Sequence, residues 1–310
     1  MTDSLARERL RNMIHLAGGE FTMGSAAFFP EERPVHRRVV DPFWIDAHPV
    51  TNAEFRRFVK ATGYRTVAER PLDPGDYPDA GPADLVPGAL VFRPTRGPVD
   101  LDDFRRWWTY MPHADWRHPQ GPGSTLDGRE RHPVTQISYQ DASAYAAWAG
   151  KSLPAEAEWE FAARGGLDNV TYSWGDDFTP KNRRMANTWL GEFPWQFLPG
   201  RGQSHRPGTT PVSTYPPNGY GLSDMTGNVW EWTADTYAPH QSAPACCTPH
   251  KPVTDTAKPV SAERFPRRVI KGGSYLCAPN YCLRYRPAAR QGQTEDTATC
   301  HLGFRCVIRP

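Results

Sequence analysis

Two cysteines near the end of the chain, Cys277 and Cys282, are the residues whose types and spacing most clearly suggest chemistry. Four residues separate them, whereas zinc knuckles and thioredoxin-type dithiols have two residues between their cysteines. Two thiols at this spacing could form a disulfide or bind one soft metal ion as thiolates. Positive charge beside a thiol lowers its pKa, and the arginines that could supply it are Arg284, Arg286, Arg290 and Arg305.

The segment 271–310, which contains both cysteines, resembles the end of formylglycine-generating enzymes, which convert a cysteine of a sulfatase to formylglycine. The resemblance extends from about Leu16 to Arg309. Most matching segments also occur in members of the wider superfamily that lack this activity, so the segment with the two cysteines is the part specific to the enzyme. The other matching segments are 45–52, 58–64, 148–160, 217–222 and 227–232.

The resemblance implies a copper-dependent oxidase that uses dioxygen and a thiol reductant. Its substrate would be a cysteine in a Cys-x-Pro-x-Arg segment of an unfolded sulfatase polypeptide. Cys277 and Cys282 would hold Cu(I), which two soft thiolates favour over harder metals. A dithiol relay, in which the two cysteines form a disulfide during turnover, is the alternative. The other implied residues are Ser274, Tyr281 and Trp230 around an oxygen pocket, and His301 and Arg284 in the substrate groove and beside the cysteines.

Calcium is the second metal that the resemblance implies. One Ca²⁺ would bind the side chains of Asp224 and Glu231 and the carbonyl oxygens of Gly227 and Val229, and all four positions match the family in residue type. Hard cations need several oxygen ligands, and a loop that combines carboxylates with free backbone carbonyls supplies them.

Two departures from the family pattern affect these expectations. A second Ca²⁺ site would use Asn187 and Thr188 with an acidic loop, but the corresponding residues 202–206 contain no carboxylate. Ala278 follows Cys277 where many family members have histidine. The missing imidazole could alter oxygen activation or thiol exchange.

The remaining cysteines match no catalytic position of the family. Cys246 and Cys247 are adjacent in a proline-rich stretch, where they could be inert, bind a metal or form a strained vicinal disulfide. Cys300 stands where the family more often has a small residue, and Cys306 lies in an apolar, strand-like end that predicts burial. Pro287 replaces a bridging cysteine of some secreted relatives, which fits a reducing compartment.

The composition of the 310 residues fits a globular protein with one large domain or two. Its 36 basic and 34 acidic residues nearly balance, so no strong field favours nucleic acid or a membrane as a partner. With 32 Pro and 26 Gly, long helices are disfavoured. The 11 Trp, 12 Tyr and 14 Phe can still bury a large core.

The first residues, 1–9, carry charges where a signal peptide needs an apolar stretch. No apolar run approaches the roughly 20 residues of a membrane span. We therefore expect a cytoplasmic protein, and a monomer. Cysteines in that compartment are more often free, metal-binding or catalytic than parts of a disulfide framework.

Turn and cap residues predict the first elements of the fold. Segments 18–24 and 37–46 are typical of two strands joined by a proline-rich loop. A helix is expected over 53–62, because Thr51 or Asn52 can cap its start and its apolar residues fall on one face.

The next part of the chain predicts a long loop and two more helices. Segment 71–100 contains seven prolines and is typical of a surface loop. A second helix is expected over 142–149, with Tyr145 and Trp148 facing inward. A third would run from the proline-started turn at 154 to about 164.

These elements predict an α+β fold. The resemblance implies a single domain of the C-type-lectin-like kind, 16–310, with little regular secondary structure, after a polar lead-in at 1–15. One group of aromatic residues has two interpretations, as core under a loop or as a wall that binds a peptide: Phe104, Trp107, Trp108 and Trp116.

The main alternative function is a non-catalytic, lectin-like binding protein of the same superfamily. Such proteins keep segment 227–232 but usually lack the cysteine pair. A third possibility is the iron-dependent sulfoxide synthases of ergothioneine synthesis, which carry an extra N-terminal helical domain for which this chain has no room. Cys277 and Cys282 favour the oxidase over both.

Overall fold

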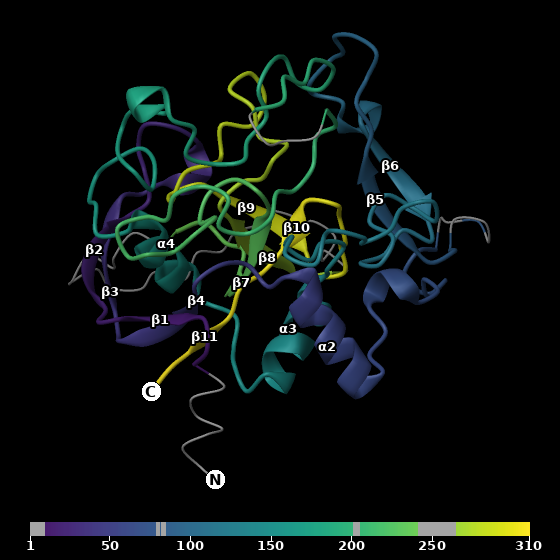
Figure 1. Ribbon diagram of the computed structural model, residues 1–310, viewed down its shortest axis with the longest axis horizontal. Helices are drawn as coiled ribbons and strands as arrows, with labels where there is room; N and C mark the ends of the chain where they lie inside the picture. Colours follow the sequence, from purple (N-terminus) through teal and green to yellow (C-terminus); the bar gives the residue numbers. More distant parts are fainter. Residues whose placement is uncertain (1–9, 79–80, 82–84, 201–204, 241–264) are drawn as a thin grey trace, which may run out of the picture.

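Four small β-sheets and three α-helices make up the computed structural model over the residues that it describes, 10–78, 81, 85–200, 205–240 and 265–310 (Figure 1). None of the helices in these ranges is long and apolar enough to cross a membrane. The predicted α+β class with little regular structure is confirmed. The helices are α2 (Asn52–Thr62), α3 (Tyr139–Trp148) and α4 (Glu156–Arg164); the strands are β1 (Met13–Leu16), β2 (Gly19–Met23), β3 (His36–Val40), β4 (Phe43–Asp46), β5 (Gly88–Phe92), β6 (Trp108–Pro112), β7 (Trp230–Thr236), β8 (Arg267–Lys271), β9 (Arg290–Thr294), β10 (Leu302–Gly303) and β11 (Val307–Ile308).

The largest sheet, at the centre of Figure 1, has four strands in the order β10-β7-β8-β9. Strand β8 runs antiparallel to both β7 and β9, while β10 runs parallel to β7. The chain leaves β8 at Lys271 and returns to the sheet at Arg290, where β9 begins. We call the residues between these strands, 272–289, the cysteine loop. The sheet therefore holds both ends of this loop.

Helix α2 begins and ends where its capping residues predict. The Thr51 hydroxyl accepts a hydrogen bond from the Glu54 amide, and the Glu54 carboxylate accepts one from the Thr51 amide, which forms a capping box. Gly63 ends the helix with a φ of 68°, a left-handed conformation that favours glycine. Phe55 is buried against Tyr145 of α3, with 5.9 Å between the ring centroids. The predicted helix is confirmed to within one residue.

Helix α3 begins three residues earlier than predicted. Its cap is Ser138, whose hydroxyl accepts a hydrogen bond from the Asp141 amide, while the Asp141 carboxylate accepts one from the Ser138 amide. Tyr145 is buried as predicted, but the inward orientation of Trp148 was wrong, because this side chain is 44% exposed. Trp148 is the last residue of α3, so its ring meets Phe58 and Tyr145 only at the edge of the core.

The prediction of a surface loop over 71–100 was wrong at residues 88–92, which form β5. This strand pairs antiparallel with β6, and Ala89 and Val91 are buried. The predicted strand over 37–46 is two strands: β3 pairs with β2, and β4 lies between β1 and β11. Strand β1 begins at Met13, within the stretch interpreted as a lead-in.

Buried ion pairs fix the central sheet to helix α4. The Lys271 ammonium at the end of β8 lies 2.9 Å from the Glu160 carboxylate, which also binds Arg164 at 2.7 Å. The Arg290 guanidinium at the start of β9 binds Glu156 at 2.7 Å. Because these charges sit at the two ends of the cysteine loop, α4 sets the positions from which the loop starts and returns.

The loss of folding stability at acidic pH should depend on Glu156. Burial alone would raise the pKa of Glu156, but a hydrogen bond to His240 and the charges of Lys271 and Arg290 outweigh it and hold the pKa at about 2, below the ordinary 4.5. Ionised Glu156 therefore stabilises the fold above pH 4.5, and this stabilisation is lost as the pH falls towards 2. The shift corresponds to about 3 kcal/mol.

We expect Glu156→Gln to be less stable than the wild type at pH 7 and to lose less further stability between pH 4.5 and 2. Urea unfolding at a series of pH values measures both effects. Glu158→Gln is the control, since Glu158 pairs with the partly exposed Arg309. An unchanged acid dependence in Glu156→Gln would contradict the assignment.

Candidate active site

A cavity of about 480 Å³ lies beside the cysteine loop. Its walls come from β5, β6, β7 and β9 and from the segment before β10, so residues far apart in the sequence meet there. Six of the seven residues expected at the proposed active site line this cavity, which we call the cysteine cavity: Trp230, Ser274, Cys277, Tyr281, Cys282 and His301.

The shape of the cysteine loop brings its two sulfur atoms together. Gly273 adopts a φ of 67°, and a Cβ there would lie 2.8 Å from the Arg284 carbonyl, so the start of the loop lies in close contact with the backbone of Arg284. At the far end, the Cys282 amide donates a hydrogen bond to the Ala278 carbonyl at 2.9 Å. This single turn returns the chain, and the Sγ atoms of Cys277 and Cys282 lie 2.8 Å apart.

Both cysteines are free thiols and buried. Their separation exceeds the ~2.05 Å of a disulfide, and the Ser274 amide donates to the Cys277 sulfur at 3.4 Å. Burial and the neighbouring sulfur raise the pKa of Cys277. The hydrogen bond from Cys277 outweighs burial at Cys282 and, with the Arg284 charge, lowers the pKa of Cys282. Cys282 therefore ionises before Cys277.

The side chains opposite the cysteines are held by hydrogen bonding and ring contacts. The Ser274 hydroxyl lies 3.0 Å from Nδ1 of His301, whose ring packs against Trp108. Burial lowers the pKa of His301, which keeps its imidazole neutral near neutral pH. Tyr281 stacks on Phe193 with centroids 4.4 Å apart, and burial raises its pKa to about 12.

Arg284 lies behind the cysteines and is not among the residues that line the cavity. Its guanidinium is 4.0 Å from the Cys282 sulfur and 2.7 Å from the Glu31 carboxylate. Arg286, two residues on, binds Glu32 with two nitrogens, and both side chains are fully buried. The two glutamates belong to one turn near the start of the chain, so this turn holds the cysteine loop in place.

Trp230 and Ala278 complete the surroundings of the sulfur atoms. Trp230 is the first residue of β7 and is 2% exposed. Ala278 is fully buried in an apolar cluster with Trp189 and Phe193. The position where many family members have histidine therefore contributes only a methyl group here.

The four aromatic residues interpreted either as core or as a peptide-binding wall do not all have the same place. Trp116 is a core residue next to Phe55, whereas Phe104, Trp107 and Trp108 line the cysteine cavity. Two polar atoms of that cavity, Nε1 of Trp107 and Oγ1 of Thr299, are buried and lack a partner among the described residues. Sequence reasoning missed Thr299, because only the pairing of distant segments brings it to the cavity.

The proposed calcium loop has free oxygen atoms. The carbonyls of Gly227 and Val229 accept no hydrogen bond from another described residue. Asp224 accepts a hydrogen bond from the Ser213 amide at 2.8 Å, and burial raises the pKa of Asp224 to about 6. Among the described residues no three His, Cys, Asp or Glu side chains are grouped to hold a metal, so a calcium ion here would rely on these carbonyls.

Glu231 already has a cationic partner. Its carboxylate is fully buried and accepts hydrogen bonds from the Arg305 guanidinium at 2.7 and 2.8 Å, and from the Trp159 indole at 2.8 Å. An oxygen of Glu231 would have to be shared between Arg305 and Ca²⁺. The carboxylate therefore stabilises the fold whether or not the ion binds.

The residues of the second calcium site are buried. The Asn187 amide donates to the Gly208 carbonyl at 3.0 Å and to the Asn228 side chain at 3.2 Å. The Thr188 hydroxyl has no partner among the described residues. Most of the loop that would complete this site, 202–204, lies outside the part of the chain that the structure describes.

Cys306 is fully buried, as predicted. Cys300 is 3% exposed, and its sulfur accepts a hydrogen bond from the Tyr275 hydroxyl at 3.4 Å. Cys246 and Cys247 lie outside the described residues, so the three interpretations of this pair (inert thiols, a metal site or a vicinal disulfide) stay untested.

The chain belongs to the family defined by the sulfatase-modifying factor enzyme 1-like domain, whose model matches residues 2–310. It is 54% identical to the formylglycine-generating enzyme of Mycobacterium tuberculosis, over 97% of this chain and 99% of that protein. Identity to the enzyme of the same name from Thermomonospora curvata is 43%, over 98% and 95%.

Two further comparisons concern a relative that is named inactive and a solved structure. Mouse inactive C-alpha-formylglycine-generating enzyme 2 is 38% identical, over 95% of this chain and 85% of that protein. Among solved structures, PvdO from Pseudomonas aeruginosa matches with a TM-score of 0.58 at 25% identity, over 95% of this chain and 93% of that one. The match to PvdO supports the fold described above.

Proposed function

We propose that this protein converts a cysteine of an unfolded sulfatase polypeptide, within a Cys-x-Pro-x-Arg segment, to Cα-formylglycine. The observation that carries the proposal is the pair of free sulfurs, Cys277 and Cys282, 2.8 Å apart at one cavity. The names of the relatives at 54% and 43% identity support it. Because a relative named inactive is still 38% identical, similarity alone does not decide the activity.

The proposed reaction consumes dioxygen and a thiol reductant. One cysteine side chain, one O₂ and two thiols would give one aldehyde, one H₂S, one disulfide and one water. The cysteine carbon loses two electrons and the two thiols lose two, which matches the four electrons that O₂ gains. The polypeptide therefore needs no further oxidant.

Cys277 and Cys282 are the residues that would hold Cu(I). Two buried sulfurs that face each other without a covalent bond fit a soft ion, which thiolates select over harder metals. When bound, Cu(I) would supply the binding and reduction of dioxygen next to the substrate sulfur.

The residues around the two sulfurs fix their positions and their surroundings. Cys282 is the sulfur that ionises first, and the Ser274 amide fixes the position of Cys277. The Ser274 hydroxyl is oriented by neutral His301. The rings of Tyr281 and Trp230 form apolar walls that exclude water from the reacting atoms.

The same cavity offers hydrogen bonds to an extended peptide. The unpartnered indole nitrogen of Trp107 is a donor, and the Thr299 hydroxyl can donate or accept. An unfolded segment brings backbone carbonyls and amides of its own, and pairing them removes the cost of leaving buried polar atoms unsatisfied. We infer that these two groups orient the substrate backbone.

We also propose that a Ca²⁺ ion stabilises the fold. Asp224 and the free carbonyls of Gly227 and Val229 provide oxygen ligands at one loop, and Glu231 could share one oxygen. Binding to the folded state alone would stabilise the protein by mass action.

The test is to incubate a synthetic Cys-x-Pro-x-Arg peptide with the protein, Cu(I), a thiol and air. Mass spectrometry should detect the aldehyde in place of the thiol, and H₂S should form in equal amount. A matched peptide with serine for cysteine controls for other oxidation. Binding of the peptide without any conversion would instead favour a non-catalytic binding protein.

A further inference from the structure

A second and larger cavity, of about 790 Å³, lies behind the wall of the cysteine cavity. Neighbouring residues divide between the two: Tyr275 and Cys300 line the second cavity, while Ser274 and His301 line the first. The two cavities therefore share two chain segments as a common wall. The volume is in the range of about 300–1,000 Å³ that suits bound ligands, and none of the roles proposed above uses this space. We call it the arginine cavity.

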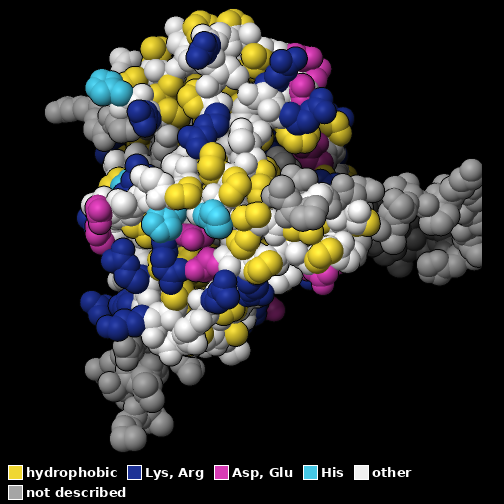
Figure 2. Space-filling model, turned by 90° about the vertical axis from the view of Figure 1, so that its right-hand side faces the viewer, with side chains coloured by type: hydrophobic (Ala, Val, Ile, Leu, Met, Phe, Trp, Pro, Cys, Tyr) yellow, Lys and Arg dark blue, Asp and Glu magenta, His cyan; other side chains and the backbone are white. Residues whose placement is uncertain are grey.

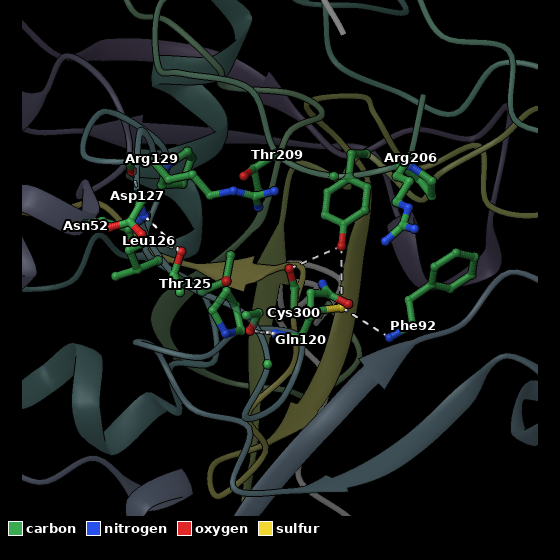
Figure 3. Close-up of a pocket in the computed structure, with 18 of the residues that line it drawn as sticks. Asn52, Phe92, Gln120, Thr125, Leu126, Asp127, Arg129, Arg206, Thr209 and Cys300 are labelled. Atoms are coloured by element: carbon green, nitrogen blue, oxygen red, sulfur yellow. Dashed lines mark hydrogen bonds between the residues drawn. The ribbon is translucent and has the colours of Figure 1, made fainter. Parts of the chain in front are cut away.

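Three arginines give this cavity its charge: Arg93, Arg129 and Arg206 all line it, and all are exposed. In Figure 3, Arg129 and Arg206 lie on opposite sides of Cys300. The acidic residue among those that line the cavity is Asp127, whose carboxylate accepts a hydrogen bond from the Thr125 hydroxyl. The lining thus carries an excess of positive charge.

Arg129 is the arginine with the greatest capacity for a ligand. Its guanidinium makes no hydrogen bond or ion pair with another described residue. It nevertheless acts on the floor of the cavity, because its charge opposes the effect of burial on the pKa of Tyr275. Arg93 donates one hydrogen bond, to the Gln120 carbonyl at 3.3 Å, which leaves most of its five donors for other partners.

The floor of the cavity is uncharged. The Cys300 sulfur is bound by the Tyr275 hydroxyl and by the Phe92 amide, and burial raises the pKa of Cys300, so this thiol is neither ionised nor free (Figure 3). Guanidinium groups around a floor of this kind pair well with carboxylates, which they bind through two parallel hydrogen bonds. The three arginines around the uncharged floor therefore favour an anionic ligand.

We propose that the arginine cavity binds acidic side chains of the substrate polypeptide that flank the Cys-x-Pro-x-Arg segment. An unfolded substrate continues beyond the motif on both sides, and six extended residues span up to about 20 Å. The shared wall makes the arginine cavity the neighbouring site for such a flank. Figure 2 shows the right-hand side of the view in Figure 1, where Lys and Arg side chains lie above and below the middle of the face, and hydrophobic, His and acidic side chains share that middle.

This assignment rests on the proposed function for the identity of the ligand, but its test does not require turnover. Fluorescent peptides carry serine in place of the reactive cysteine and six residues on each side of the motif. One peptide has three glutamates in its N-terminal flank, one has three in its C-terminal flank, and a third has glutamine at all of these positions. Fluorescence anisotropy gives the Kd of each.

We expect the wild type to bind at least one glutamate peptide roughly tenfold more tightly than the glutamine peptide, as a few charge-assisted hydrogen bonds allow. In the double variant Arg129→Gln/Arg206→Gln this preference should fall to about twofold or less. Arg38→Gln is the matched control, because Arg38 is exposed on β3 and lines none of the cavities described here. Raising the NaCl concentration should weaken the preference, since exposed charges are screened.

Two results would overturn the proposal. The first is a wild type that binds the glutamate and glutamine peptides equally. The second is a preference that survives in the double variant. If citrate raises the melting temperature of the wild type but not of the double variant while the peptides bind equally, the cavity takes a small carboxylate, which also overturns the assignment to the polypeptide. Failure of conversion together with a retained glutamate preference would refute the proposed function alone.

Discussion

Cys277→Ser and Cys282→Ser should each lower kcat/KM for conversion of a Cys-x-Pro-x-Arg peptide by about a thousandfold or more. Removing either member of a group that acts as a unit costs nearly as much as removing both, so the double variant should be little worse than the single ones. The reason is structural: the two sulfurs face each other at 2.8 Å and line the same cavity. Peptide conversion by mass spectrometry measures this effect.

The control variant is Cys300→Ser, which changes a buried sulfur of the neighbouring cavity and should retain most activity. A second readout separates a metal site from a dithiol relay. Wild-type protein should bind one Cu(I) per chain, each single variant should bind it more weakly, and Ag(I) should compete. Full conversion by rigorously copper-free protein would refute the metal site and leave the relay, in which the two cysteines form a disulfide.

Arg305→Met and Glu231→Gln should each lower the free energy of unfolding by about 3–5 kcal/mol, because either change leaves one charge or a set of donors buried without its partner. Arg305 and Glu231 are fully buried and joined by two hydrogen bonds. Urea unfolding monitored by tryptophan fluorescence gives the loss. Arg309→Met is the matched control, since its pair with Glu158 is partly exposed and should be worth about 1 kcal/mol or less.

A further variant, Asp224→Asn, tests the role of calcium. If Ca²⁺ binds Asp224 and the nearby carbonyls, a chelator should lower the melting temperature of the wild type. Asp224→Asn should remove most of that response, whereas Arg309→Met should keep it. A wild-type melting temperature that does not respond to chelator would show that Glu231 stabilises the fold through Arg305 and Trp159 without calcium.

Local signals in the sequence predicted the elements with clear ends. Helix α2 could be placed because Thr51, Glu54 and Gly63 fix its first and last turns through contacts within a few residues. The burial of Cys306 followed from its apolar neighbours. These features depend on short-range patterns, which a single sequence displays.

The features that sequence reasoning predicted wrongly or missed depend on contacts between distant segments. The prolines on either side of β5 suggested a loop, but Gly88–Phe92 is a strand because β6 pairs with it and because the Leu90 amide bonds to the Ala298 carbonyl. The arginine cavity gathers residues from six separate stretches of the chain, so no local sequence motif predicts it. Among the predicted residues of the cysteine cavity, Cys277 and Cys282 stood out by their type and spacing. The other four, Trp230, Ser274, Tyr281 and His301, came from the family resemblance, which carries information about tertiary structure that spacing alone does not.

The ion pair between Glu32 and Arg286 has a consequence for biosynthesis. These residues are 254 positions apart, and Arg286 sits in the loop that carries both cysteines. A ribosome makes the turn with Glu32 long before the cysteine loop, so the carboxylate of Glu32 lacks this partner until the 254 residues up to Arg286 have been made. Long-range closures of this kind slow folding. The cysteine loop is therefore held by this ion pair only after Arg286 has been made and can reach Glu32.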